Sequence, residues 1–390
     1  MRALPFLLAL LAVPTTAHAF AAKETSRGAL VHFRDRHVVL IADQTKKAER
    51  DALLLKASTS AAQAWSEPGE VDVEIRPGAR DIGFIQGGNN ENVIAFDDGR
   101  WDFDSDMLAL SLVHFDVATG EIFDADIVIN TDGYNWADKA EHASVDAYDL
   151  ANTLTHELGH VVGLAHSTTD EATMFPTSGK DEVTKRDLAD DDVQGLTEIY
   201  GTLGAPGTPE PSVSSLLPPG CSSTGAPGLT TLLLLPALFL RRRKALVGCA
   251  LLSVAALSAP GVARADPPSL ARVLSRADRV LEGTVIRQEV RRNARGLLVT
   301  ISPLRVDRCL VGACGATLEL EQLGGELDGV GLAVEGITPL SPAASVTIAV
   351  RSERGRTIPV LGDAGILADH RISSQHRLEG LRAQIFSARR

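Results

Sequence analysis

The sequence has few cysteines, and its C-terminal part has no lysine. Only four cysteines occur in 390 residues, and the first of them is Cys221. Residues 1–203 must therefore fold without disulfide bonds. They carry 35 acidic and 16 basic residues, whereas residues 266–390 carry 14 acidic residues and 17 arginines. The acidic half excludes nucleic-acid binding, which needs a basic surface, and the contrast in charge indicates two folding units.

The sequence also lacks an apolar run of about 20 residues, the length that a relaxed membrane span needs. A shorter run covers residues 3–13, with Arg2 before it and the tripeptide Ala17-His18-Ala19 after it. This order is typical of a secretory signal peptide over residues 1–19, removed before Phe20. We therefore expect a secreted protein, either extracellular or held at the cell surface.

Residues 20–203 show alternating patterns for strands and longer periodic patterns for helices. Strands are predicted within 29–43, 71–75 and 92–96, and residues 108–115 and 122–129 form a predicted hairpin around Thr119-Gly120. Helices are predicted at 46–65, from an N-cap at Ser144 to about 162, and at 185–200, where Gly201 follows. This succession predicts an α+β domain.

The strongest signal is the segment His156-Glu157-Leu158-Gly159-His160-Val161-Val162-Gly163-Leu164-Ala165-His166. It fits the pattern H-E-x-x-H-x-x-G-x-x-H at every fixed position, and a chance match is rare. His156 and His160 are four residues apart, so one helix face presents both to a single ion. Gly163 permits a turn that returns His166 as a third ligand.

Three nitrogen ligands leave one zinc coordination position open, which is typical of a catalytic site. Glu157 lies beside the ligand face and is predicted to be the general base that takes a proton from the attacking water. The segment therefore predicts one catalytic Zn²⁺ and hydrolysis of a carbonyl compound.

With Ser167 after the third histidine, this segment resembles the metzincin metallopeptidases and, among them, the matrixins. Residues 172–176 (ATMFP) resemble the family's Met-turn, residues 191–201 its closing helix, and residues 120–130 a strand of short bacterial matrixins. The resemblance covers about residues 28–203. It implies a twisted sheet with three helices, Met174 beneath the zinc, and protein or peptide substrates. The family's Pro-Arg-Cys-Gly segment is absent, so cysteine-based latency is not expected.

Two neighbouring segments carry further hypotheses. In the matrixins the edge strand that corresponds to residues 108–115 pairs with extended substrate, as strand addition allows. Residues 102–106 (DFDSD) have alternating carboxylates that a Ca²⁺ ion would accept. They lack the glycine and distal glutamate of an EF-hand loop, so a solvated acidic loop is favoured.

The pattern in the middle of the chain is typical of a sorting region. Residues 204–227 are rich in Pro, Gly and Ser and predict a linker. Cys221, the apolar run in 228–244 and Arg241-Arg242-Arg243-Lys244 resemble the myxobacterial C-terminal sorting tail, which implies attachment to the cell surface. Residues 245–265 form a second signal-like segment ending in Ala263-Arg264-Ala265.

Two explanations remain open for this region. Either two neighbouring secreted proteins are joined in one reading frame, or residues 228–260 make a hairpin anchor in the membrane. Both leave the arginine cluster in the cytoplasm. Residues 266–390 predict a small all-β barrel or sandwich of unknown function. In it Cys309 and Cys314 form either a short-loop disulfide or two unpaired thiols.

The resulting hypothesis is a secreted zinc-dependent endopeptidase. The alternative is a surface-attached binding protein whose zinc site has little catalytic activity. The sequence makes no prediction of oligomeric state.

Overall fold

The computed structural model describes residues 20–44, 47–78, 89–201, 269–370, 373 and 375–388. The chain divides into two compact units, Met1–Gly207 with Val262–Arg390, and Thr208–Gly261. All described residues belong to the first unit. The predictions for residues 1–19, 204–227, 228–244 with Cys221, and 245–265 fall outside the described residues, so they stay predictions. Among the described residues, no helix is long and apolar enough to cross a membrane.

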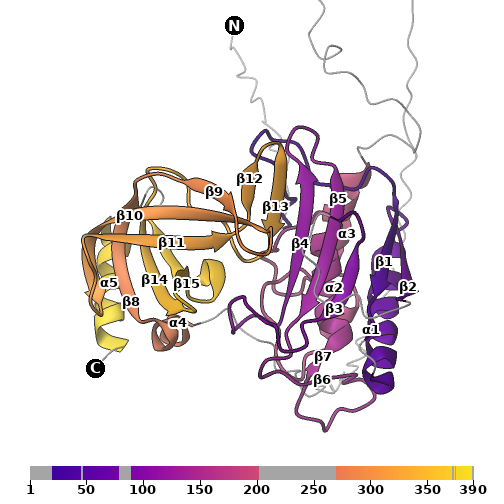
Figure 1. The fold of residues 1–390 in the computed structure, drawn as a ribbon. Helices are drawn as coiled ribbons and strands as arrows, with labels where there is room; N and C mark the ends of the chain where they lie inside the picture. Colours follow the sequence, from indigo (N-terminus) through magenta and orange to yellow (C-terminus); the bar gives the residue numbers. More distant parts are fainter. Residues whose placement is uncertain are drawn as a thin grey trace, which may run out of the picture. The chain divides into compact units, whose positions relative to one another are not determined.

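A seven-stranded mixed sheet forms the framework around which the site is built (Figure 1). Its strand order is β12-β13-β4-β5-β3-β1-β2. The N-terminal half supplies five of these strands: β1 (His37–Ala42), β2 (Asp72–Pro77), β3 (Val93–Phe96), β4 (Ala109–Asp116) and β5 (Ile122–Ile129). β2, β1, β3 and β5 run parallel, and β4 is antiparallel to β5. The predicted hairpin of β4 and β5 is confirmed.

A glycine makes the turn of this hairpin possible. Gly120 has φ +77°, and a Cβ atom there would lie 1.9 Å from the carbonyl oxygen of Leu30. Only glycine combines this backbone conformation with such a close approach. The hairpin tip is thereby held against the N-terminal segment.

Three helices pack with this sheet: α1 (Ala48–Ser66), α2 (Leu150–Val161) and α3 (Asp190–Gly201). Trp65 of α1 is fully buried, and its Nε1 donates to the carbonyl oxygen of Thr155 in α2 at 2.7 Å. One apolar core unites the three helices with the strands, including Leu40, Leu54, Ile127, Leu154, Leu158, Leu196 and Ile199. The predicted α+β fold class is confirmed.

Two predicted helix starts are wrong. α2 begins at Leu150, capped by Asp149, whose carboxylate accepts from Asn152 N at 2.6 Å. A two-stranded pairing of β6 (Trp136–Ala137) with β7 (Tyr148–Asp149) occupies the chain just before it. Residues 184–186 form a separate 3-10 turn, η1 (Thr184–Arg186), and α3 starts only at Asp190.

The second sheet of the structure lies in residues 279–369. Its main order is β11-β10-β8-β14-β15, with β9 beside β10 and β16 beside β14. The strands are β8 (Arg279–Val285), β9 (Glu289–Arg292), β10 (Leu298–Val311), β11 (Thr317–Leu323), β14 (Ser345–Glu353), β15 (Arg356–Pro359) and β16 (Ile366–Asp369). All its pairings are antiparallel. Cys309 and Cys314 form a disulfide bond in it.

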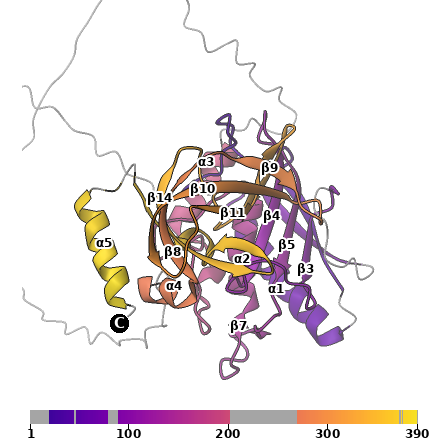
Figure 2. The ribbon, with the colours of Figure 1, turned by 60° about the vertical axis from the view of Figure 1, so that its left-hand side comes forward.

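This C-terminal half differs from the all-β prediction in three features. It contains helices α4 (Leu270–Arg276) and α5 (Gln375–Ala388) and a 3-10 turn, η3 (Gly362–Gly365). Val273 of α4 and Ile385 of α5 pack into an apolar cluster with residues of β8, β10 and β14. Figure 2 shows α4 and α5 on the side of the molecule where β8 and β14 lie. In addition, β12 (Gly325–Leu327) and β13 (Val330–Val334) belong to the sheet of the N-terminal half and not to this one.

Candidate metal centre

The three histidines of the sequence motif meet at one point. Their possible ligand atoms all lie within 4.8 Å of one another. The Nε2 atoms of His156 and His160 are 3.1 Å apart, because α2 places the two side chains one turn apart on one face. The ring of His166 lies 5.2 Å from that of His156 and 5.0 Å from that of His160, measured between centroids.

Gly163 brings His166 back to the end of α2. Its φ is +101°, and a Cβ atom there would lie 2.2 Å from the carbonyl oxygen of Val31. Its backbone N–H donates to His160 O at 3.1 Å, which ends the helix. The chain can therefore reverse at this residue only if it is glycine.

Hydrogen bonds fix the tautomers of two of these histidines. Nδ1 of His156 lies 2.7 Å from Thr173 O, and Nδ1 of His160 lies 2.9 Å from Leu164 O. A carbonyl oxygen only accepts, so each Nδ1 carries the proton and each Nε2 presents a lone pair. Burial lowers the pKa of both imidazoles well below the ordinary value and favours their neutral forms.

This arrangement fits a bound cation. Two bare Nε2 lone pairs 3.1 Å apart repel each other unless a proton or a metal ion lies between them. The depressed pKa values oppose a proton. Neutral imidazoles whose other nitrogen donates to a carbonyl oxygen are what zinc ligation requires.

Glu157 lies beside the ligand face in a buried position. Ser111 Oγ of β4 is 2.7 Å from Glu157 Oε2, and donates there or to the backbone oxygen of Glu157, 3.0 Å away. Burial raises the pKa of Glu157 to about 7, although the bond from Ser111 acts in the opposite direction. A carboxyl group with a pKa near neutrality can both accept and return a proton.

Met174 packs against the helix that carries the first two ligands. It is buried, and a Cβ atom on Gly159 would lie 2.2 Å from its Sδ. The carboxylate of Asp192 in α3 accepts from the backbone N–H groups of Met174 at 3.0 Å and of Thr173 at 2.8 Å. The turn that holds His156 through Thr173 O is thus itself held by α3.

Sequence reasoning missed two polar residues of this site. One is Ser111, and the other is Glu335, whose Oε1 accepts from the backbone N–H of His166 at 3.1 Å. The same oxygen lies 3.3 Å from His166 Nδ1, and Oε2 lies 3.3 Å from Lys23 Nζ. Glu335 follows β13 in the C-terminal half, 169 residues after His166 in the sequence. No local sequence motif therefore connects it with the histidines.

A cavity of about 400 Å³ opens over the histidines. Its walls include the start of β4 and the segment after the Met-turn, and they also include Glu335, Gly336, Leu361 and Asp363 from the C-terminal half. All three histidines and Glu157 thus line a space that both halves of the chain enclose.

The acidic loop of residues 102–106 is less solvated than expected. Asp104 is 6% exposed and forms an ion pair with Arg351, while Asp106 lies 2.9 Å from another nitrogen of the same guanidinium group. Arginines thus hold the carboxylates that the calcium hypothesis considered. The solvated-loop prediction is wrong for Asp104.

Comparisons with known proteins agree with the geometry. Residues 13–201 match the family model described as Matrixin. Metalloendoproteinase 4-MMP of Arabidopsis thaliana is 39% identical over 99 residues, which are 23% of this chain and 27% of the relative. Matrix metalloproteinase-20 of Homo sapiens is 30% identical over 187 residues, 46% of this chain and 35% of the relative. The chain therefore spans about a third or less of the length of these two curated relatives.

Proposed function

We propose that this protein is a secreted zinc-dependent endopeptidase, because residues 13–201 match the Matrixin family model and are similar to matrix metalloproteinases. The observation that carries the proposal is the meeting of three histidines beside a buried glutamate. His156, His160 and His166 would hold the zinc, and Glu157 would be the general base. The side of β4 that faces away from β5 would align a protein or peptide substrate.

The residues of the chain divide the work of peptide hydrolysis between them. When bound, zinc supplies Lewis acidity to the scissile carbonyl and lowers the pKa of the attacking water. Glu157 takes a proton from that water and returns it to the leaving amine. Ser111 Oγ holds the glutamate carboxylate in place from β4. Thr173 O and Leu164 O keep the first two imidazoles in the ligating tautomer.

Secretion is part of the same proposal, and the signal-like residues 1–19 support it. Attachment to the cell surface through Cys221 and residues 228–244, with transient or anchoring membrane contact through 228–260, is proposed on the sorting-tail resemblance. The competing function is a surface-attached binding protein that retains zinc with little catalysis. Catalytic turnover separates the two.

Glu157→Ala tests the mechanism directly. The variant keeps all three histidines, so it should retain one zinc per chain by atomic absorption. It should lose hydrolysis of a quenched-fluorescent peptide by about 10³-fold or more, because the proton acceptor is gone. Glu171→Ala removes an exposed carboxylate outside the site and serves as the control. Undiminished hydrolysis by Glu157→Ala would remove Glu157 from the mechanism.

A further inference from the structure

A strand of the C-terminal half covers the edge at which the peptidase would align its substrate. β13 pairs antiparallel with β4, from Val330 opposite Asp116 to Val334 opposite Leu112 (Figure 1). β12 then pairs with the outer side of β13 and completes a hairpin. An extended peptide can add to a sheet edge only where that edge is unpaired. Residues 112–116 of β4 are therefore already paired with a strand of the same chain.

The contact is apolar and closely fitted. Leu332 and Val334 of β13 are 3% and 4% exposed. They share a core cluster with residues of both halves: Trp101, Phe103, Leu110, Leu112, Val128, Leu297 and Leu298. Gly331 lies against the ring of Phe115, where a Cβ atom would come within 2.2 Å of two ring carbons. Any larger residue at this position requires the Phe115 ring or β13 itself to shift, which disturbs the contact with β4.

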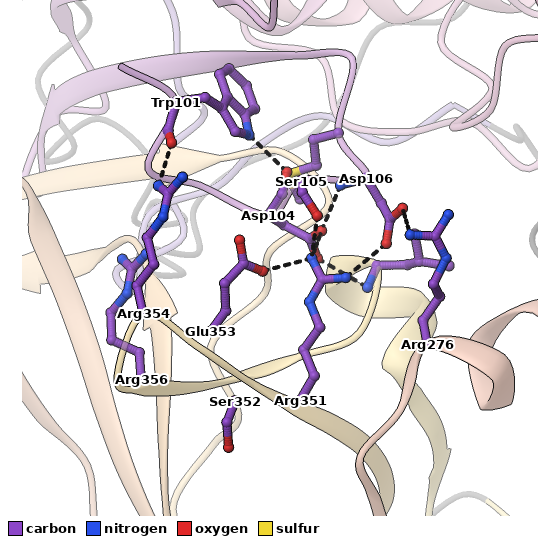
Figure 3. A network of polar contacts seen from close by, with 12 residues as sticks. Trp101, Asp104, Ser105, Asp106, Arg276, Arg351, Ser352, Glu353, Arg354 and Arg356 are labelled. Carbon is purple, nitrogen blue, oxygen red and sulfur yellow. Dashed lines mark hydrogen bonds and ion pairs between the residues drawn. The ribbon is translucent and has the colours of Figure 1, made fainter. Parts of the chain in front are cut away.

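Arginines of the C-terminal half pair with the acidic loop beside this contact (Figure 3). Arg351 binds Asp104 and Asp106, and Arg276 lies 2.9 Å from Asp106. Arg354 and Arg356 reach Asp102 at 2.9 and 3.1 Å. The guanidinium group is suited to paired carboxylate contacts. Acidic residues of the N-terminal half thus pair with arginines of the C-terminal half at this interface.

The chain that leaves β13 enters the catalytic cavity. Glu335 accepts from the backbone N–H of His166 at 3.1 Å, and its carboxylate also faces Lys23. An ideal Cβ on Gly336 would lie 3.8 Å from the His166 ring. Both residues line the cavity over the histidines. The segment therefore runs along the edge strand and on into the site, over the course that an extended substrate would take.

We propose that residues 269–388 form an inhibitor domain for the peptidase, in which the β12–β13 hairpin and Glu335 occupy the substrate edge and the cavity. The inference rests on the proposed function and adds its regulation. The inhibitor is reversible, because β13 makes no covalent bond to β4. Peptide hydrolysis begins when the hairpin leaves the edge.

The test uses the full chain with two variants that weaken the contact by different means. Gly331→Val introduces the clash with Phe115, and Arg351→Glu places a carboxylate against Asp104 and Asp106. Gly329→Asn and Arg305→Glu are matched controls. Gly329 has open space around its Cβ position at φ +84°, and Arg305 is 64% exposed and pairs with Asp307 within its own half.

Two readouts separate this inference from the proposed function. Binding of a fluorescent peptide hydroxamate reports access to the edge and the zinc, and hydrolysis of a quenched-fluorescent peptide reports catalysis. Both variants should bind the hydroxamate and cleave the peptide about tenfold faster than wild type, because a tethered blocker acts at high effective concentration. The two controls should match wild type.

Equal hydroxamate binding by wild type and both variants overturns the inhibitor domain, whatever the hydrolysis rate. Faster binding without any hydrolysis supports the blocked edge and contradicts the proposed peptidase function.

Discussion

At the scale of single residues, Met174 is proposed to be a packing floor rather than a ligand. Its thioether sulfur is a poor partner for zinc beside three imidazoles. Met174→Leu conserves volume in a buried position, so it should cost less than about 1.5 kcal/mol of unfolding free energy. Urea unfolding would measure the cost, and atomic absorption would measure the zinc. A variant that folds but loses its stoichiometric zinc would show that the sulfur matters chemically.

Gly163 has a conformational role in the site. Gly163→Ala puts a Cβ atom 2.2 Å from Val31 O at φ +101°, and it should destabilise the fold by about 3 kcal/mol or more. Zinc affinity should fall as well, since His166 follows the turn. Gly133→Ala is the matched control, because Gly133 also has positive φ but open space around its Cβ position. Equal losses in the two variants would mean that only backbone strain, and no contact with Val31, is involved.

Residues close together in the sequence were the predictable ones. The histidines, Glu157 and Gly163 fall within eleven consecutive positions, so helix periodicity and one glycine turn fix their meeting. Ser111 and Glu335 reach the same site from β4 and from the end of β13. Nothing in their own neighbourhoods distinguishes them, because their roles arise only from strand pairing.

At the scale of elements, α3 is predicted to maintain the Met-turn through one side chain. Asp192 is fully buried and accepts from the backbone N–H groups of Thr173, Met174 and Ala189. Asp192→Ala would leave these three donors without acceptors, at a cost of about 3 kcal/mol or more in unfolding free energy. Asp190→Ala, an exposed change in the same turn of α3, should cost less than about 1 kcal/mol. Chemical denaturation of both variants measures the difference, and similar costs would rule out the proposed role.

The wrong helix starts have physical causes outside the helices. Lys139 Nζ donates to Ala143 O at 2.7 Å, which fixes a compact loop where the sequence predicted a helix from Ser144. Lys185 is buried, and its Nζ donates to the carbonyl oxygen of Thr177 at 2.8 Å. This bond ties the residues around Lys185 to the segment after the Met-turn, so they do not join α3. Side-chain contacts to loop carbonyl groups of this kind override local helix propensity.

At the scale of the whole molecule, composition predicted two folding units, whereas the structure unites the N-terminal and C-terminal halves in one compact unit with a shared sheet. The contrast between an acidic half and an arginine-rich half is visible in the sequence. The pairing of β13 with β4 is not, because register between distant strands depends on which edges meet. The short pattern of residues 325–334 therefore gave no sign that it belongs to the N-terminal sheet.

The exported product is predicted to be two polypeptides. The apolar runs in residues 228–257 are about 13 residues each, shorter than the roughly 20 of a relaxed span, and Ala265 ends a signal-type cleavage site. Mass spectrometry should find an N-terminus at Asp266. The fragment should copurify with the peptidase, because the shared apolar cluster and the ion pairs do not depend on the linker. Peptides that cross Ala265 in an intact chain would instead favour the hairpin anchor.

A peptide-library digest would reveal zinc-dependent peptide hydrolysis without any assumption about the cleavage site. Wild type and Gly331→Val would be incubated with the library in three states: as purified, after removal of metal by a chelator, and after zinc is restored. We expect cleavage that disappears with the chelator, returns with zinc, and is faster in Gly331→Val. Absence of cleavage by both zinc-loaded proteins, or cleavage that persists in the chelator, would contradict this expectation.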